Sequence, residues 1–313
     1  ESIDQFVEEN DFEVMYTISG GSLALHSSEN IEYSKVMKLT DFSLNEAKKR
    51  GRNRCYIFDE KDYSRFIRKG EITQELREAT RNGFQGFVAF YQPVIEAKSG
   101  RLSGAESLMR FSSSKFGMVS PVEFIPILEE TGLIIPVGRW MMKEAMEKCS
   151  QIRKVIPGFK VNINISQVQV SKSDVIIDIA DEMEKAGLSP EAMNIELTES
   201  DLLEGDINTQ HFLKELKRMG IKLALDDFGT GYSNFHYLSE LDPEIIKIDR
   251  SFTSSAVADE KEYYLLKQFC RMIHNLGLKI CIEGVENQEE WAKIQKLEPD
   301  FGQGFFWGRP CGY

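Results

Sequence analysis

The stretch LALDDFGTGYSNF, residues 223–235, follows an apolar run with two adjacent aspartates and a glycine-rich turn. Successive residues of a strand point to opposite faces of a sheet. Asp226 and Asp227 can therefore reach one site only if the strand stops between them and the chain bends. Gly229 and Gly231 permit such a bend, because glycine adopts positive φ without steric cost. The stretch predicts a strand that ends on two carboxylates serving a common site.

From about residue 84 onward, short runs with strand character alternate with amphipathic helical patterns. The eight runs are 87–95, 101–111, 160–166, 193–200, 221–227, 244–249, 278–284 and 300–306. Between most of them lie helical stretches such as 120–132, 174–187 and 208–220, each ending in the glycine expected just past a helix. This alternation predicts an α/β chain folded as a (β/α)8 barrel, with a doubly wound sheet as the alternative.

The first two runs depart from a regular barrel. The segment between them, EAKSG at 96–100, is too short for a helical crossover and predicts a hairpin turn. We therefore expect a TIM-like barrel in which one strand is antiparallel to its neighbour.

The segment before the barrel has a different character. It predicts two short strands within 14–26, a helix over 39–51 capped near Thr40 and Asp41, and a strand over 53–58. Residues 59–83 carry alternating charges that are typical of a helical connector. The predicted organisation is a small α+β segment at 1–62, a helical connector at 63–83 and the barrel domain at 84–313.

Composition limits the classes of function. The formal net charge of −12 over 313 residues disfavours binding of polymeric nucleic acid, because such domains usually carry a basic face. The five cysteines are odd in number and widely spaced, which favours reduced thiols and a cytoplasmic location. No apolar run approaches the roughly 20 residues that span a bilayer. A membrane anchor of a parent protein would lie outside this sequence.

Polar or acidic residues end six consecutive predicted strands, at the mouth where catalytic groups of such barrels gather. They are Glu106, Asn164, Glu196, Asp226 with Asp227, Lys247 with Asp249, and Glu283, and a seventh strand contributes Gln303. Carboxylates and an amide, without histidine or cysteine, suit Mg²⁺, Mn²⁺ or Ca²⁺ rather than zinc. A single strand-terminal acid is more often a helix cap, but recurrence on most strands favours two ions. Such a pair of ions serves displacement at phosphorus.

Several residues near this mouth have two interpretations. Lys247 either neutralises the acids or holds the attacking water or a phosphate oxygen. Arg110 either binds phosphate at the barrel mouth or pairs with a loop acid. Phe235, Tyr237 and Leu238, just beyond the two aspartates, are either dimer contacts or core residues.

Residues from about 84 to 313 resemble the EAL domain, the family of cyclic di-GMP phosphodiesterases. The matching motifs are YQPVI (91–95), GAESLMRF (104–111), FIPILEETGLI (124–134), NINIS (162–166), ELTES (196–200), DDFGTGYSNF (226–235), IKIDRSF (246–252), IEGVE (282–286) and GQGFFWGRP (302–310). The resemblance implies a barrel with one antiparallel strand, Mg²⁺ or Mn²⁺, and hydrolysis of cyclic di-GMP to linear pGpG. It also implies a homodimer, which we expect to form through the loop after Asp227.

The resemblance assigns roles residue by residue. The family's metal ligands carry over onto Glu106, Asn164, Glu196, Asp226, Asp227 and Glu283. Lys247 matches the catalytic lysine, acting with Glu106, Asp226 and Asp227, while Glu199 matches the acid that braces the loop after them. Arg110 matches a phosphate contact, and Gln92, Glu286 and Gln303 match further substrate-binding positions.

The sequence departs from the family pattern at two motif positions. Ser107 replaces the alanine of EAL, and because it lies on the strand face opposite Glu106 we expect it to point at the surrounding helices. Phe111 stands where the family usually has tryptophan.

Residues 14–58 resemble the second half of a GGDEF domain, chiefly through LTDFSLNEAKKRGRNRCYIF at 39–58. The sequence GGDEF itself does not occur in the 313 residues, which excludes synthase activity of this chain. Two other functions remain as alternatives. One is a catalytically silent cyclic di-GMP receptor that signals through the connector or a dimer interface, and the other is a scaffold that binds no nucleotide.

Overall fold

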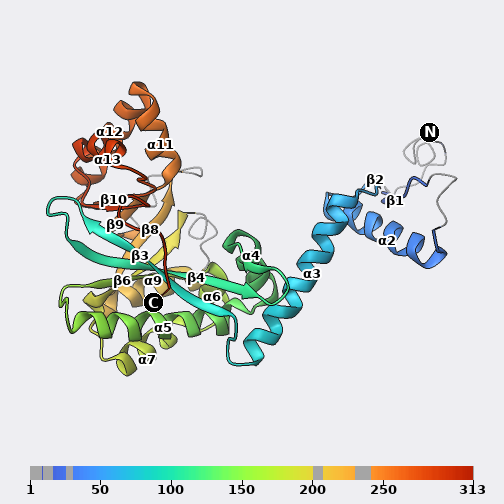
Figure 1. Ribbon diagram of the computed structural model, residues 1–313, viewed down its shortest axis with the longest axis horizontal. Helices are drawn as coiled ribbons and strands as arrows, with labels where there is room; N and C mark the ends of the chain where they lie inside the picture. The colour runs from blue at the N-terminus through green and yellow to red at the C-terminus, as the bar shows by residue number, and fades with distance from the viewer. Residues whose placement is uncertain (1–8, 10–16, 26–30, 200–206, 230–240, 313) are drawn as a thin grey trace. The chain divides into compact units, whose positions relative to one another are not determined.

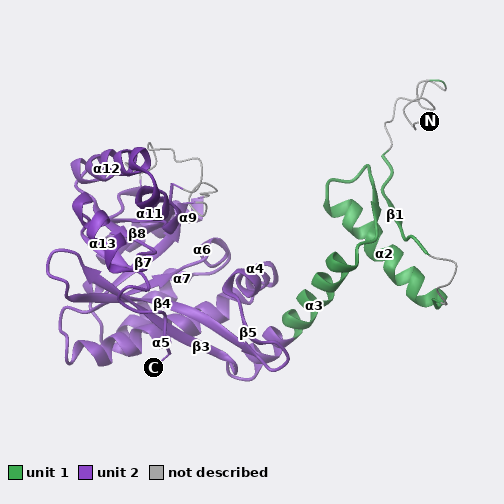
Figure 2. Ribbon diagram, turned by 45° about the horizontal axis from the view of Figure 1, so that its top comes forward, with its two compact units in different colours: residues 1–74 green, residues 75–313 purple. Residues whose placement is uncertain are grey.

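The structure is a computed structural model that describes residue 9 and residues 17–25, 31–199, 207–229 and 241–312. The chain forms two compact units, Glu1–Gln74 and Glu75–Tyr313 (Figure 2). The division falls within α3, Glu60–Arg81, a helix that confirms the predicted helical character of the connector. The predictions for Gly231, Phe235, Tyr237 and Leu238 lie outside the described residues.

The first unit contains a β-α-β arrangement. β1, Gly20–Ser22, pairs in parallel with β2, Cys55–Ile57, and α2, Tyr33–Lys49, lies between them in the sequence. β2 confirms the strand predicted over 53–58. The described part of 14–26 holds one strand, β1, where the sequence predicted two.

The predicted start of the helix in the first unit is wrong. α2 begins at Tyr33, with Glu32 as its N-cap, rather than near Thr40 and Asp41. The Thr40 hydroxyl donates a hydrogen bond to the Val36 carbonyl at 2.8 Å, as a threonine inside a helix does. The apolar spacing that begins at Leu39 extends back to Val36, and the helix itself begins at Tyr33, about two turns before the capping residues that the sequence indicated.

An aromatic cluster forms the core of this unit. The ring of Phe42 lies 6.2 Å from that of Phe58, 5.2 Å from that of Tyr63 and 5.3 Å from that of Phe66, measured between centroids. Ring pairs at such distances stabilise a fold beyond the area that they bury. The cluster joins α2, the end of β2 and the start of α3.

The second unit is a closed barrel of eight strands surrounded by helices (Figure 1). The strands follow the order β3-β11-β10-β9-β8-β7-β6-β4, and β4 pairs back with β3. This closure confirms the predicted barrel and excludes the doubly wound sheet. The barrel strands are β3 Phe87–Glu96, β4 Leu102–Ser113, β6 Lys160–Asn164, β7 Met193–Thr198, β8 Lys222–Phe228, β9 Ile245–Ile248, β10 Lys279–Ile282 and β11 Phe301–Gln303.

β3 is the antiparallel strand of the barrel. It pairs antiparallel with both β4 and β11, whereas the other neighbouring barrel strands are parallel. The hairpin between β3 and β4 closes with a hydrogen bond from the Gly100 N–H to the Glu96 carbonyl at 2.9 Å. The predicted hairpin turn at 96–100 is therefore confirmed. A short strand, β5 at Gly117–Val119, extends the β4 hairpin outside the barrel.

Helices cover the outside of the barrel. They are α4 Pro121–Thr131, α5 Ile134–Arg153, α6 Gln167–Lys172, α7 Val175–Ala186, α9 Ile207–Met219, α11 Arg250–Ala258, α12 Glu260–Asn275 and α13 Gln288–Ile294, with single 3-10 turns at Pro190–Ala192 and Gln295–Leu297. α4, α7 and α9 end just before glycines with positive φ, as predicted. Among the described helices, none combines the length and apolar character needed to cross a bilayer.

The barrel interior is filled below its carboxyl end. Val94, Ala224, Ile245 and Cys281 are buried together, with Phe301 packed against them. These side chains come from five different strands and pack against one another inside the barrel. This apolar cluster lies beside buried polar side chains, because Asn162 and Asn194 line the same small internal space as Val94, Ile245 and Cys281.

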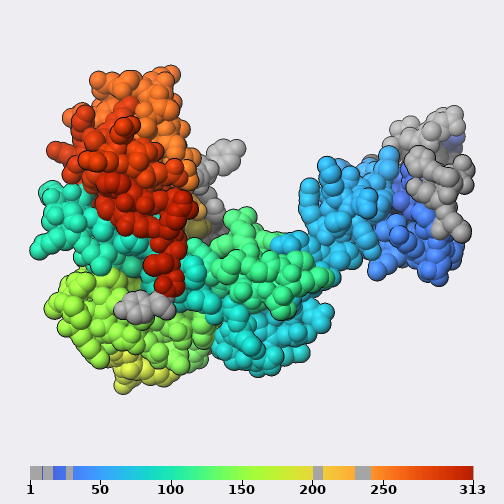
Figure 3. Space-filling model, in the orientation of Figure 1, coloured from blue at the N-terminus to red at the C-terminus, as the bar shows by residue number. Residues whose placement is uncertain are grey.

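The end of the chain lies along β3. The N–H of Tyr91 donates to the Cys311 carbonyl at 2.9 Å, and the N–H of Cys311 donates back to Tyr91 at 3.2 Å. In the space-filling view this last segment, in red, runs down over the barrel (Figure 3).

Phe111, where the family usually has tryptophan, packs with Phe87 and Phe124 away from the barrel mouth.

Candidate metal centre

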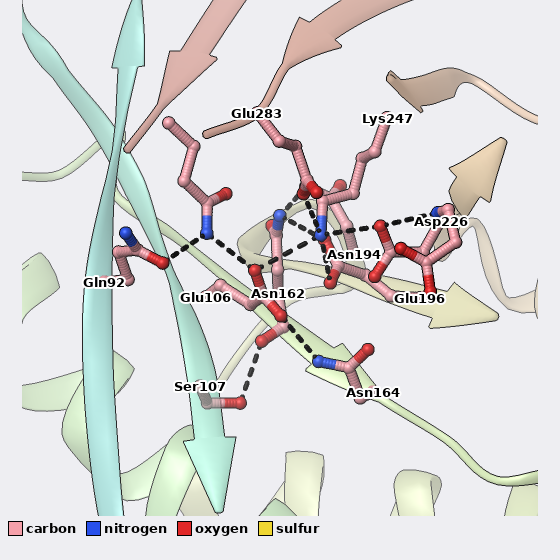
Figure 4. A network of polar contacts seen from close by, with 12 residues as sticks. Gln92, Glu106, Ser107, Asn162, Asn164, Asn194, Glu196, Asp226, Lys247 and Glu283 are labelled. Carbon is pink, nitrogen blue, oxygen red and sulfur yellow. Dashed lines mark hydrogen bonds and ion pairs between the residues drawn. The ribbon is translucent and has the colours of Figure 1, made fainter. Parts of the chain in front are cut away.

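The buried ammonium group of Lys247 lies at the centre of the polar mouth of the barrel (Figure 4). Its Nζ contacts one carboxylate oxygen on each of four other strands or strand ends. The distances are 3.2 Å to Glu106 Oε2, 2.9 Å to Glu196 Oε2, 3.1 Å to Asp226 Oδ1 and 2.8 Å to Glu283 Oε1. Barrel closure thus brings together acids that are widely separated in the sequence.

The acids form two groups that could each hold a cation. Each group offers three carboxylate oxygens that lie within 4.8 Å of one another. The first group is Glu106, Glu196 and Asp226, and the second is Asp226, Asp227 and Glu283. Asp226 belongs to both, which is the arrangement expected of a carboxylate that bridges two ions.

The site carries more negative than positive charge. Burial raises the pKa of Glu283 to about 8, and the charges of Asp226 and Glu106 add to this effect against that of Lys247. Partial desolvation and the charge of Asp226 raise the pKa of Asp227 to about 6. Burial by itself would lower the pKa of Lys247, but the surrounding carboxylates raise it well above its ordinary value. The lysine therefore stays charged without neutralising all the acids.

The two aspartates reach one site through a bulge. The pairing of β8 with β9 shifts register between Leu225 and Phe228, and Asp227 has φ +53°. The sequence predicted that the strand stops between Asp226 and Asp227, and this prediction is wrong, because β8 continues to Phe228. The bend occurs at Asp227 itself, because aspartate tolerates the left-handed conformation, and strand pairing resumes at Phe228.

Glu199 lies against the segment that follows the two aspartates. Its Oε2 accepts a hydrogen bond from the Gly229 N–H at 2.9 Å. Gly229 has φ +94°, and a Cβ there would lie 2.7 Å from Cζ of Phe252. The positive φ therefore favours glycine at this position, and the nearby Phe252 ring would have to shift to admit a Cβ.

Amide side chains hold both carboxylate oxygens of Glu106. The Gln303 amide donates to Glu106 Oε2 at 2.7 Å and to Gln92 Oε1 at 3.1 Å. The Asn164 amide donates to Glu106 Oε1 at 2.8 Å. Burial would raise the pKa of Glu106, but Lys247 and these amides bring it below its ordinary value. Both oxygens of this carboxylate are therefore fixed.

A cleft opens above the acids, with about 600 Å³ of space that includes its opening to solvent. Its lining includes Glu106, Asp226, Lys247 and Glu283 together with Gln92, Gln303 and Glu286. Arg250 also lines it and pairs with Glu286 at 2.6 Å. Sequence reasoning did not single out Arg250, which follows Asp249 at the start of α11. Asp249 itself caps that helix by accepting from the Ser251 N–H at 2.8 Å.

Arg110 is half-buried beside the mouth. Burial lowers its pKa, and its guanidinium lies 5.6 Å from the centroid of the Phe90 ring. Within the described part of the chain, it forms no ion pair with an acid. The predicted pairing with a loop acid is therefore not observed among these residues.

Ser107 and two buried asparagines lie next to the acidic groups. Sequence reasoning did not single out the two asparagines. The Ser107 hydroxyl donates to the Asn162 carbonyl at 2.8 Å across the β4–β6 pair, so it bonds a neighbouring strand rather than a helix. Asn162 and Asn194 are buried inside the barrel. Each lies two residues before a predicted ligand, Asn164 or Glu196, and so on the same strand face. This two-residue spacing is the feature of the sequence that could have identified both asparagines.

The residues present fit a pair of divalent cations. Five carboxylates against one ammonium leave four negative charges, which equals the charge of two such ions. All the donor atoms are oxygens, the ligands that Mg²⁺ and Mn²⁺ prefer. The donors that would hold the ions are Glu106, Asn164, Glu196, Asp226, Asp227 and Glu283.

Two known proteins of similar sequence have names that refer to cyclic di-GMP phosphodiesterases. The bifunctional diguanylate cyclase/cyclic di-GMP phosphodiesterase MucR of Pseudomonas aeruginosa is 29% identical over 292 residues, which cover 92% of this chain and 42% of that protein. The probable cyclic di-GMP phosphodiesterase PdeG of Escherichia coli is 33% identical over 254 residues, which cover 80% and 49%. The chain spans less than half the length of these relatives.

Similar solved structures carry the same fold. The PaMucR phosphodiesterase in complex with c-di-GMP matches with a TM-score of 0.70 and 30% identity, covering 77% of this chain and 98% of that one. An EAL domain protein from Listeria monocytogenes matches with a TM-score of 0.63 and 27% identity, covering 78% and 93%. Residues 73–310 match the EAL domain itself. The chain therefore belongs to the EAL domain family.

Proposed function

We propose that this chain hydrolyses cyclic di-GMP to linear pGpG in a reaction that requires Mg²⁺ or Mn²⁺. The observation that carries the proposal is the pair of acidic groups that share Asp226 around Lys247, at the base of the cleft. Relatives named as cyclic di-GMP phosphodiesterases and a related structure in complex with c-di-GMP support the choice of substrate.

The chain's own residues would orient the reacting groups. Two divalent cations, when bound, would lower the pKa of a water molecule and neutralise charge on the phosphate oxygens. Lys247 would hold the water or a phosphate oxygen, since its ammonium group is kept charged beside both acidic groups. Glu199 would hold the backbone after Asp227 in place through its bond to Gly229.

The cleft supplies groups of the right chemistry for a guanine dinucleotide. Glu286 lines it and could accept hydrogen bonds from the N–H groups of guanine, with Arg250 released from its ion pair. Gln92 and Gln303 add hydrogen-bonded amides to the lining of the same cleft. Arg110 lies beside the mouth with its guanidinium available to a phosphate.

The proposal includes assembly and location. We propose a homodimer formed through the loop after Asp227, and action in the cytoplasm. Light scattering coupled to size-exclusion chromatography would measure the mass in solution. A monomer under all conditions of metal and nucleotide would contradict the dimer without affecting the proposed chemistry.

The test of the reaction is to incubate the chain with cyclic di-GMP and Mg²⁺ or Mn²⁺ and to follow pGpG by chromatography. We expect metal-dependent product that disappears in Asp226→Asn. Asp242→Asn is the matched control, because Asp242 is exposed and pairs with Lys217 outside the cleft. Binding of the nucleotide by calorimetry without any product would instead favour the receptor function, and neither binding nor product would favour the scaffold.

A further inference from the structure

Two buried asparagines lie below the metal centre and are joined to it by hydrogen bonds (Figure 4). The Asn162 amide donates to Glu196 Oε1 at 2.7 Å. The Asn194 amide in turn donates to Asn162 Oδ1 at 2.8 Å. The two residues are direct neighbours in the β6–β7 pairing, so their side chains lie side by side on the inner face of the barrel.

Glu196 is held at both of its carboxylate oxygens by this arrangement. Oε1 accepts from Asn162, and Oε2 contacts Lys247 at 2.9 Å. The residue is fully buried, so these two groups set the plane of the carboxylate. The side-chain oxygen of Asn162 in turn accepts the hydrogen bond from the Asn194 amide, which sets the direction of the Asn162 amide group.

The asparagine pair is costly in a barrel core. Asn162 and Asn194 are 7% and 3% exposed and line one small pocket together with the apolar side chains of Ile245 and Cys281. Asn194 Oδ1 is buried and has no hydrogen-bond partner among the described residues. A buried polar atom without a partner lowers stability, and an apolar side chain would avoid that loss. Stability of the core alone therefore does not account for the pair.

We propose that Asn162 is a positioning residue that orients Glu196 for metal binding, and that Asn194 holds Asn162 in the required rotamer. The inference rests on the proposed function, because it assigns these amides a part in the same metal-dependent site. Hydrogen bonds behind a metal ligand commonly set the ligand's orientation, and their loss weakens metal affinity about 10- to 100-fold.

The test compares Asn162→Leu with Ser107→Ala. Asn162→Leu introduces an apolar side chain of similar size and removes the donor to Glu196. Ser107→Ala removes a hydrogen bond to the same residue's backbone and leaves the donor in place. For each protein we would measure Mn²⁺ and Mg²⁺ affinity by calorimetry, kcat and KM for cyclic di-GMP, and unfolding in urea.

For Asn162→Leu we expect metal affinity to fall at least about tenfold and kcat to fall with it, at an unchanged KM. Asn194→Leu should show a smaller loss of the same kind. Ser107→Ala should lose stability only. Metal affinity and kcat in Asn162→Leu equal to those of Ser107→Ala would overturn the proposal, since the asparagine would then be a core residue only.

A second measurement does not depend on activity. Asn162→Leu, Glu196→Met and the double variant form a cycle in which urea unfolding of the metal-free protein reports the coupling between the two side chains. We expect non-additive effects, and strict additivity would overturn the proposal. If the unchanged chain binds no metal, the proposed function fails, while the cycle still decides whether Asn162 holds Glu196.

Discussion

The Nζ atom of Lys247 lies 3.1 Å from Oδ1 of Asp226, the carboxylate that belongs to both acidic groups. The same Oδ1 accepts a hydrogen bond from the Asp227 N–H at 2.9 Å. One oxygen of Asp226 thus contacts both Lys247 and the backbone N–H of Asp227, the residue at which the strand bends. In the metal-free protein, Lys247 is the cation that makes this concentration of acids tolerable.

Lys247→Met should therefore destabilise the metal-free protein strongly. Removing one partner of a buried ion pair leaves uncompensated charge and typically costs about 3–5 kcal/mol. Urea unfolding at neutral pH should show this loss. Saturating Mg²⁺ should restore part of it, because a cation that binds only the folded state stabilises that state. A loss unchanged by Mg²⁺ would argue against metal binding at these acids.

Metal affinity should rise with pH. Asp227, with a pKa of about 6, and Glu283, with a pKa of about 8, are partly protonated near neutral pH. Ligands must lose their protons to bind a cation, so binding should release protons and strengthen as pH rises from 6 toward 8. Calorimetry in two buffers of different ionisation enthalpy would count the protons. No proton release at pH 7 would contradict the expectation.

The metal-free protein should lose stability as the pH rises. The folded-state pKa of Glu283 is raised above its ordinary value to about 8, so the folded state binds the proton more tightly than the unfolded state does. The resulting stability is fully present below about pH 4.5 and is lost as pH increases through 8. Glu283→Gln should flatten this part of the curve of Tm against pH, measured in chelator. An unchanged slope would mean that groups other than Glu283 cause the loss of stability with rising pH.

Glu199→Gln should slow turnover without abolishing metal binding. The variant replaces the charged acceptor of the Gly229 N–H with a neutral one and so weakens the bond that holds the backbone after Asp227. We expect kcat to fall about tenfold. Glu147→Gln is the control, since Glu147 is exposed on α5 and pairs with Lys143 on the same helix. Equal kcat in the two variants would remove Glu199 from the mechanism.

Arg110→Ala should raise KM for cyclic di-GMP more than it lowers kcat, if the guanidinium binds a phosphate in both the ground state and the transition state. A change of about tenfold in KM is expected for one charged hydrogen bond. Arg101→Ala, at the exposed β3–β4 hairpin, is the matched control. An unchanged KM would leave Arg110 as a packing partner of Phe90.

The sequence by itself determined the barrel. Strand and helix periodicities are local, so the eight strand runs, the hairpin at 96–100 and the glycines that end α4, α7 and α9 could all be identified from neighbouring residues. The predicted ligands were identifiable for a related reason. Parallel strands bring their carboxyl ends to one edge, so polar residues there share a mouth whatever their separation in sequence.

Tertiary structure alone decided how those residues meet. The start of α2 at Tyr33 was missed because a capping pattern competes with an apolar face that continues past it. The bend was assigned to the turn containing Gly229 and Gly231 instead of to Asp227, because glycine is the expected residue for positive φ and the bulge depends on pairing with β9. Position in the sequence does not specify such pairings.

The central place of Lys247 and the asparagine pair beneath Glu196 have the same origin. Lys247 meets carboxylates contributed by four other parts of the barrel, and Asn162 reaches Glu196 only across the β6–β7 pair. These contacts depend on barrel closure and strand register, which are non-local and which a periodic pattern cannot encode. The sequence thus specified which groups gather at the mouth, and the closed sheet specified which of them touch.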